Sequence, residues 1–333
     1  MGNSSNSVIT IQLDSRFVSV GNPLSGNVHC ELSSPLDAGV LDLELTGTEM
    51  CEWRDILPTK EPIRQKGTRR VAQHVVSLCT LDGEEYSPGS YSFPFEFPVP
   101  ETFPASFFIK QPPCTEAEVW YSVVAYLKCD DWVVKSEPEY LTVGSRPAVI
   151  KSLEESVSAS MLTWCFFSQG EAHLTVHIDK NAYKPGEIMQ ISLEIDNSES
   201  KLDITSVSAT LSRRIRLRSN TGRSTISSQT ISSCSSDHSV CAGESSSQKL
   251  LQLPVKLTFP GIKKAPTVKG MNIECVYFLT VSAETGGAFM CCGGLPEVVR
   301  EVVIYSGEQR EKCRVEKKKG KKREDKSAIP SVE

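Results

Sequence analysis

The chain has 333 residues, enough for about two domains of ordinary size, each with its own hydrophobic core. Hydrophobic residues make up 39% of the sequence and charged residues 23%, the balance of a globular protein, which excludes general disorder. The net charge is −5 at pH 7, and no apolar run approaches the roughly 20 residues that a membrane-spanning helix needs.

The N-terminal residues are polar and contain no apolar segment typical of a secretory signal. We therefore expect the reducing cytosol, where the twelve cysteines remain thiols, most of them buried, and none has the Cys-x-x-Cys spacing of a structural zinc site. Gly2 is a candidate for N-myristoylation, although the sixth position of that pattern is Asn6 here instead of Ser or Thr. A plain disordered start is the alternative.

From Val8 onward, β-branched and aromatic residues fall in short alternating runs. The clearest runs are residues 8–13, 41–45, 173–178 and 190–195. Alternation places one side of each strand in a core and the other in solvent, and runs separated by turn residues are typical of β-sandwiches. We expect an all-β protein with one domain at residues 7–143, a linker at 144–170 and a second domain at 171–306.

A first group of basic residues follows Trp53 and is expected to lie in a loop. Its members are Lys60, Arg64, Lys66, Arg69 and Arg70, against the single acid Glu61. Basic side chains at this density favour phosphorylated or acidic segments of a partner.

A second basic group lies in a run that reads as a strand, where alternation places Arg214, Arg216 and Arg218 on one face. Aligned guanidinium groups suit phosphate or carboxylate. The alternative, which we favour, is a solvated edge strand that charge protects from pairing with another chain. The Ser-, Thr- and Gly-rich residues 219–248 that follow are predicted to be unstructured.

The C-terminal tail, residues 307–333, is predicted to be disordered because it is charged and has no apolar periodicity. It holds ten Lys/Arg and six Asp/Glu, so the rest of the chain is acidic. The basic residues cluster at Lys317, Lys318, Lys319, Lys321, Lys322 and Arg323. Such a cluster favours an anionic membrane surface, each charge contributing on the order of 1 kcal/mol, and would supply the second signal that a single myristoyl chain needs. A solvated tail or a nuclear-import-like stretch is the alternative.

The two halves of the chain repeat one strand pattern about 165 residues apart. Residues 17–32 and 40–47 correspond to residues 183–195 and 202–211. Further along, Pro94-Phe-Glu-Phe-Pro-Val-Pro is similar to Pro254-Val-Lys-Leu-Thr-Phe-Pro, and Val119-Trp-Tyr-Ser to Cys275-Val-Tyr-Phe. A repeat of this length predicts two related domains in tandem.

The ordered motifs of both halves resemble the arrestin superfamily, most closely its arrestin-domain-containing (α-arrestin) branch. The N-terminal half carries Leu45-Thr-Gly followed by Trp53, then residues 91–101, Pro104-Ala-Ser-Phe and residues 119–127. The C-terminal half carries residues 164–170, Tyr183-Lys-Pro-Gly-Glu and Ile195-Asp-Asn-Ser. Together these motifs span most of residues 8–305.

The resemblance implies two immunoglobulin-like β-sandwich domains with cupped faces, without an active site or a cofactor. It implies an adaptor or scaffold that binds cytoplasmic tails or loops of membrane proteins and couples them to endocytic trafficking, sorting or signalling. It also places the cargo-engaging finger loop after Trp53. We expect a cytoplasmic protein with peripheral association with the plasma or endosomal membrane.

Two departures from the family pattern leave the coupling to ubiquitin-ligase or coat machinery open. The only Pro-Pro pair, Pro112-Pro113, is followed by Cys114, so there is no Pro-Pro-x-Tyr motif, and the tail has no clathrin box. A retromer-type trafficking scaffold is therefore an alternative. Nucleic-acid binding through the tail is not expected, because no aromatic residues alternate with the basic ones.

Residues for catalysis are missing from the sequence. The closest histidines, His173 and His177, would stand about 13 Å apart on a strand, at a rise of ~3.3 Å per residue, too far to bind one metal. No nucleophile motif or phosphate-cradling loop is present. We therefore expect no enzyme.

Overall fold

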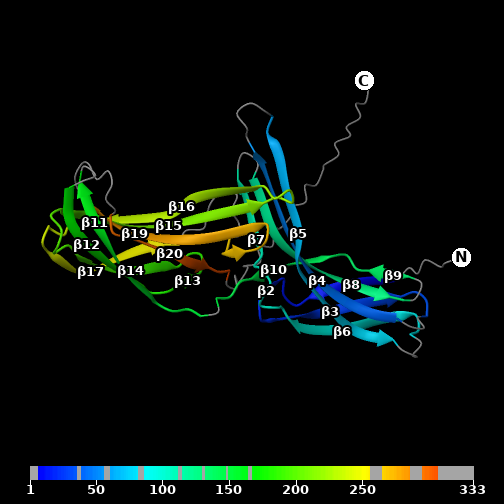
Figure 1. Ribbon diagram of the computed structural model, residues 1–333. Coiled ribbons are helices and arrows are strands. Elements are labelled where there is room, and N and C mark those ends of the chain that lie inside the picture. Colours follow the sequence, from blue (N-terminus) through cyan, green and yellow to red (C-terminus); the bar gives the residue numbers. More distant parts are fainter. Residues whose placement is uncertain are drawn as a thin grey trace, which may run out of the picture.

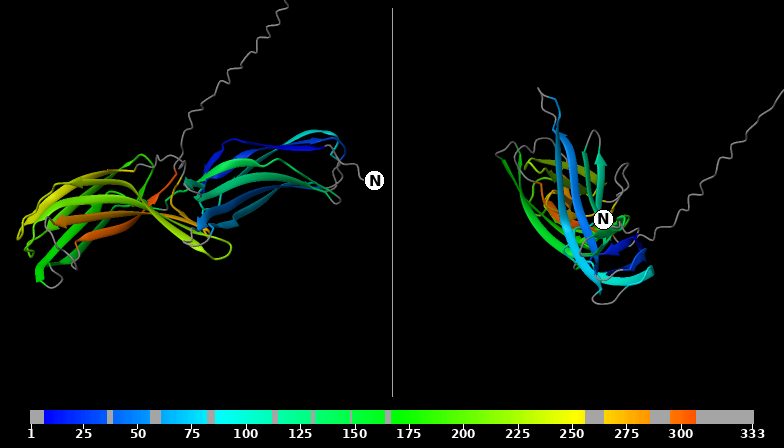
Figure 2. Two further views of the ribbon diagram at one scale, coloured as in Figure 1. Left: turned by 90° about the horizontal axis from the view of Figure 1, so that it is seen from above. Right: turned by 90° about the vertical axis from the view of Figure 1, so that its right-hand side faces the viewer.

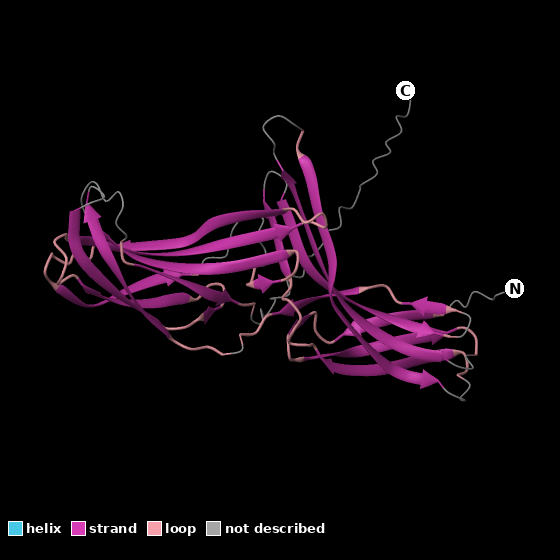
Figure 3. Cartoon of the chain, in the orientation of Figure 1, coloured by secondary structure: helices cyan, strands magenta, loops and turns pink. Residues whose placement is uncertain are grey.

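The computed structural model shows two domains joined end to end, each built from two packed sheets (Figure 1). It describes residues 7–35, 39–55, 61–81, 86–111, 115–129, 132–147, 149–163, 167–255, 265–285 and 295–306. Every regular element in these residues is a strand, as Figure 3 shows, which confirms the all-β prediction. No helix that could cross a membrane occurs in the described residues. Gly2, Lys60, the basic cluster at residues 317–323 and the whole tail lie outside them.

The N-terminal domain packs a three-stranded sheet on a seven-stranded one. The smaller sheet has the order β1 (Val8–Leu13), β3 (Pro23–Leu32), β6 (Gly89–Pro98). The larger sheet has the order β2 (Phe17–Ser19), β10 (Glu139–Gly144), β8 (Thr115–Lys128), β4 (Gly39–Asp55), β5 (Ile63–Leu81), and β7 (Phe107–Gln111) and β9 (Val133–Lys135) also pair with β8. All of these pairs are antiparallel except β2 with β10.

The C-terminal domain repeats this arrangement. Its smaller sheet has the order β11 (Leu153–Thr163), β12 (Phe167–Ile178), β14 (Ile188–Asp196), β17 (Ser245–Pro254). Its larger sheet has the order β13 (Ala182–Tyr183), β20 (Glu297–Ile304), β19 (Ile273–Thr285), β15 (Ile204–Arg218), β16 (Ser224–Ser236), and β18 (Val268–Lys269) pairs with β19. Again only the short first strand, β13, is parallel to its neighbour, β20. The main paths of the two larger sheets, β2-β10-β8-β4-β5 and β13-β20-β19-β15-β16, thus match in strand order.

The structure corrects the register of one part of the repeat. The backbone N–H of Val99 donates to Asn22 beside the turn at Gly21, and the N–H of Val255 donates to Glu187 beside the turn at Gly186. Val99 is therefore the counterpart of Val255, whereas the sequence comparison aligned Val99 with a residue four positions later. A strand pattern has a period of two residues, so a slip of four residues preserves every apolar position and the sequence alone does not detect it.

The segment expected to be a linker and the Ser-rich segment expected to be unstructured both contain strands. The segment at residues 144–170 contains β11, which pairs with β12 at the edge of the smaller sheet. The Ser-rich residues 219–248 contain β16 and the start of β17, so the prediction of an unstructured segment was wrong. Ser and Thr accept an extended backbone when a neighbour supplies the hydrogen bonds, and β16 pairs with β15 along its whole length.

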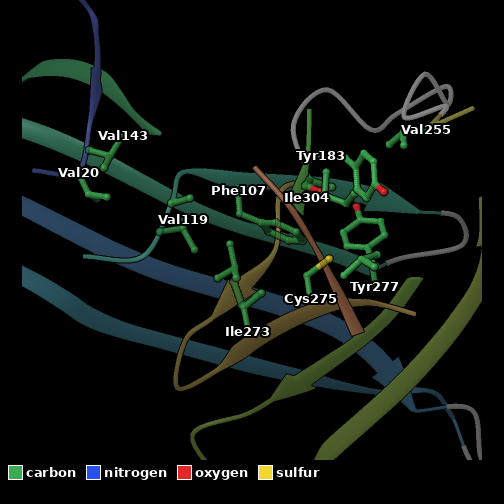
Figure 4. Close-up of a cluster of buried hydrophobic side chains, with 14 of the residues drawn as sticks. Val20, Phe107, Val119, Val143, Tyr183, Val255, Ile273, Cys275, Tyr277 and Ile304 are labelled. Atoms are coloured by element: carbon green, nitrogen blue, oxygen red, sulfur yellow. The ribbon is translucent and has the colours of Figure 1, made fainter. Parts of the chain in front are cut away.

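The core follows the alternation of the strands and continues from one domain to the other. In β4 and β15 nearly every second residue is buried. The buried side chains of the two domains form one contiguous cluster. Figure 4 shows part of it at the domain junction, where Phe107 and Val119 of the N-terminal domain gather with Ile273 and Cys275 of the C-terminal domain. The two domains therefore bury apolar side chains against each other.

Candidate functional site at the domain junction

The first basic group lies on a strand, which corrects the prediction of a loop. Arg64, Lys66, Arg69 and Arg70 belong to β5, which forms a long hairpin with β4 that rises beside the C-terminal domain (Figures 1 and 2). Exposed Arg64, Lys66 and Arg70 share one face by alternation, and Arg69 lies on the other. Only Arg64 of these has an ion pair in the described residues, with Glu52 of β4 at 2.5 Å.

The second basic group lies on an interior strand, because β15 runs between β19 and β16. The alternative of an edge strand was therefore wrong, while the predicted shared face is confirmed: Arg214, Arg216 and Arg218 are exposed and alternate with buried Ile215 and Leu217. Arg216 forms an ion pair with Glu274 at 2.9 Å, and the guanidinium of Arg214 lies 4.7 Å from the ring centre of Phe278. Two of the three cations are thus already occupied by neighbours on β19.

The strands that carry the two basic groups meet at the junction. The backbone N–H of Asn220, in the turn after β15, donates to the carbonyl of Lys66 at 3.1 Å, and the N–H of Thr68 donates to Asn220 Oδ1 at 3.1 Å. Gly67 permits this approach, because a Cβ atom there would lie 2.4 Å from the carbonyl oxygen of Arg218. This contact therefore brings the basic stretch of β5 next to the C-terminal end of the basic stretch of β15.

A buried carboxylate, which was not among the candidate residues predicted from the sequence, joins the domains beside this contact. Glu49 of β4 is fully buried, and its Oε2 accepts hydrogen bonds from the backbone N–H groups of Asn272 at 2.9 Å and Met271 at 3.2 Å. Its Oε1 has no hydrogen-bond partner among the described residues and packs against Gly270, where a Cβ atom would overlap it. Burial raises the pKa of Glu49 despite the two hydrogen bonds and the charge of Arg69, which lower it.

The sequence did contain a signal for Glu49. It occupies the core-facing register of the run Leu41, Leu43, Leu45, Gly47, Glu49, Cys51, Trp53, where an acid is out of place. The thiol of Cys51, next on the same face, donates to the carbonyl of Arg218 at 3.2 Å. Core-facing side chains in the second half of β4 therefore contact the C-terminal domain.

The described residues contain no group of His, Cys, Asp and Glu side chains that could hold a metal ion. The junction combines exposed cations on two strands with hydrogen bonds and apolar packing between the domains. Two tandem sandwiches of matching topology, locked in this way, define an arrestin-type two-domain protein.

Comparison with known proteins agrees with this class. The model for the N-terminal domain of "Arrestin (or S-antigen)" matches residues 9–146, and the model for its C-terminal domain matches residues 168–309. The chain belongs to the arrestin family, as a member of the α-arrestin type.

Curated relatives support the α-arrestin type. The chain is 26% identical over 187 residues to arrestin domain-containing protein 5 of Bos taurus, covering 54% of this chain and 55% of that protein. It is 26% identical over 201 residues to the Homo sapiens protein of the same name, covering 56% of each chain, and 26% identical over 209 residues to human arrestin domain-containing protein 4, covering 55% and 46%. The matches thus span about half the length of these relatives.

Proposed function

We propose that this protein is a non-enzymatic adaptor that binds cytoplasmic tails or loops of membrane proteins and couples them to endocytic trafficking, sorting or signalling. Family membership supports the adaptor role. The observation that carries the binding step is the exposed face of β5, where Lys66 and Arg70 form no ion pair within the described part of the chain.

The spacing of these cations suits an extended partner. Lys66 and Arg70 lie four residues apart on one face of a strand, which separates their Cα atoms by roughly 13 Å at ~3.3 Å per residue. Phosphorylated or acidic side chains at similar spacing on an extended peptide would meet one cation each. We infer that the partner segment is extended and carries at least two anionic side chains.

A sheet edge near the same junction supports this mode of binding. β16 is the last strand of its sheet, and its 13 residues, Ser224–Ser236, include no charged residue and no proline. Natural sheets usually protect such edges with charge or proline, so an unprotected edge suits strand addition by an extended peptide.

Peptide binding to the full chain tests the proposal. Fluorescence anisotropy would compare a receptor-tail peptide with its phosphorylated form, using wild type, a Lys66→Glu/Arg70→Glu variant and the control Lys135→Glu on β9. We expect roughly tenfold tighter binding of the phosphorylated peptide, lost in the double variant and kept in the control, because charge-assisted hydrogen bonds are each worth about 1.5–3 kcal/mol. Equal, negligible binding of both peptides would contradict the proposal. Stoichiometric co-purification with coat subunits would instead favour the retromer-type scaffold.

We also propose peripheral association with plasma or endosomal membrane through Gly2 and the basic cluster of the tail, which lie outside the described residues. Sedimentation with vesicles containing anionic lipid would compare the full chain with a variant in which the six basic residues at 317–323 are replaced by Gln. Loss of sedimentation in the variant, with no retention of wild type on DNA at matched salt, is the expected result. Affinity capture of the membrane-bound protein would identify the partner machinery, whether ubiquitin ligase or coat.

A further inference from the structure

An arginine occupies a core position of the C-terminal domain. Arg213 is 1% exposed and lies between buried Leu211 and Ile215 on the inner face of β15. Its Nη2 donates to Oε1 of Gln229 at 2.7 Å, while Nε and Nη1 have no hydrogen-bond partner among the described residues. No ion pair to Arg213 occurs there either. A buried cation without a counter-charge is costly, so the site calls for an anion.

The two nearest titratable groups do not provide that anion. The thiol of Cys275 and the hydroxyl of Tyr277 lie beside the guanidinium, whose charge lowers the pKa of both groups, and a hydrogen bond with Arg213 also lowers the pKa of Tyr277. Burial outweighs these effects, raising the pKa of Cys275 to about 12 and that of Tyr277 well above its usual value. Both groups are therefore neutral at physiological pH.

Comparison of the two domains shows that the fold itself does not require this arginine. Tyr121 and Tyr277 are counterparts, because each hydroxyl donates to a backbone carbonyl at 2.5 Å, of Pro104 and of Ala265 respectively. The residue paired with Tyr121 is Gly47, whose other partner is Ala72; the residue paired with Tyr277 is Arg213, whose other partner is Gln229. A small, apolar pair in one domain is thus replaced by a cation and an amide in the other.

A cavity of about 190 Å³ adjoins Arg213. Its lining consists of Gln111, Arg213, Ile215, Ser227, Ser228 and Gln229. The lining offers hydroxyl and amide donors and no carboxylate, and the volume equals that of roughly six waters at ~30 Å³ each. Exposed Ser227 and Ser228 on β16 open the cavity to solvent, and Gln111 at the end of β7 brings in the N-terminal domain.

We propose that this cavity is a binding site for a phosphoryl group, held by the buried Arg213 guanidinium and by the surrounding Ser and Gln side chains. Phosphate supplies the missing counter-charge and has enough oxygens to accept from the guanidinium, the hydroxyls and the amides together. The site is distinct from the exposed cations of β5, so it stands whether or not the adaptor proposal holds.

The proposal is tested by titration calorimetry of the full chain with inorganic phosphate, at ionic strength held constant with NaCl. The variants are Arg213→Gln, which removes the charge, and Arg218→Gln, which removes an exposed charge from the same strand. We expect saturable binding by wild type, at least about tenfold weaker in Arg213→Gln and within about twofold of wild type in Arg218→Gln, given the strength of charge-assisted hydrogen bonds. Absence of saturable binding, or equal binding by Arg213→Gln, overturns it.

Two further arms keep the test decisive. Gln111→Ala leaves the core of the C-terminal domain intact and is expected to weaken phosphate binding severalfold. It keeps the proposal testable if Arg213→Gln does not fold. Unchanged phosphate binding in Gln111→Ala would then contradict the site. A phosphoserine peptide that binds in an Arg213-dependent way and is displaced by inorganic phosphate identifies a phosphorylated partner as the source. Binding of inorganic phosphate alone identifies the free anion, and tighter binding of acetate than of phosphate contradicts the proposal.

Discussion

Glu49 and Asn272, 223 residues apart in the sequence, are joined by a 2.9 Å hydrogen bond from the backbone N–H of Asn272 to the Glu49 carboxylate. This contact lies where β4 of the N-terminal domain meets the start of β19 in the C-terminal domain. Because the carboxylate is buried, it couples the association of the domains to its own ionisation.

We predict that Glu49→Ala lowers the free energy of unfolding by about 2 kcal/mol, because two backbone N–H groups lose their acceptor and each such loss costs about 1–3 kcal/mol, partly offset by removal of a buried charge. Glu49→Gln keeps an oxygen acceptor and is expected to lose far less. Urea unfolding at pH 7 measures both. Equal losses in the two variants would show that the hydrogen bonds are unimportant.

The same residue predicts a pH dependence. The folded pKa of Glu49 is raised by burial, so the native state binds a proton more readily than the unfolded state, and stability falls as pH rises through the interval between the two pKa values. Wild type should therefore gain stability relative to Glu49→Gln as pH is lowered from 7 towards 5. Urea unfolding of both proteins across this range measures the difference, and a difference independent of pH would contradict the assignment.

Gly67 is predicted to be needed for the junction. In Gly67→Ala the new Cβ would lie 2.4 Å from the backbone oxygen of Arg218, which no rotamer change relieves, so we expect a loss of about 1–3 kcal/mol. Gly89→Ala is the matched control, because its nearest neighbouring atom would lie 3.9 Å away. Thermal unfolding and limited proteolysis of the β4–β5 hairpin measure the effect. Identical behaviour of the two variants would contradict the need for glycine at the contact with Arg218.

The duplicated tyrosine contact predicts a pair of equivalent variants. Tyr121→Phe and Tyr277→Phe each leave a carbonyl without its donor, and we expect each to cost about 1–2 kcal/mol. Tyr140→Phe, at a position 58% exposed, should be neutral. Chemical denaturation of the three variants provides the comparison. A neutral Tyr121→Phe or Tyr277→Phe would refute a structural role for that hydroxyl.

The buried thiols are predicted to be inert in the native protein. Burial raises the pKa of Cys30 and Cys51 to about 11 each, so little thiolate exists at pH 8. Exposed Cys241 should be alkylated faster, though the charge of Glu244 raises its pKa, and Glu244→Gln should accelerate the reaction. Iodoacetamide labelling with mass spectrometry measures the three sites. Rapid native labelling of Cys30 or Cys51 would show that the core opens.

Alternation along the chain was sufficient to predict an all-β fold, the tandem repeat and the face of β15 that carries Arg214, Arg216 and Arg218, because a period of two residues separates core from solvent locally. It was insufficient for the register between Val99 and Val255, since that same period tolerates slips of even length. It also missed β16, whose Ser-rich sequence becomes a strand only because β15 lies beside it.

The functional residues divide in the same way. From the sequence, Glu49 and Arg213 are visible as charged residues at core-facing positions, and the basic residues of β5 and β15 as two separate groups. Only the tertiary structure decides that Glu49 meets Asn272, that Asn220 joins β5 to the end of β15, and that Arg213 adjoins a cavity without an acid. The physical reason is that side-chain direction depends on neighbours along the chain, whereas a charge finds or lacks a partner through contacts between residues up to 223 positions apart.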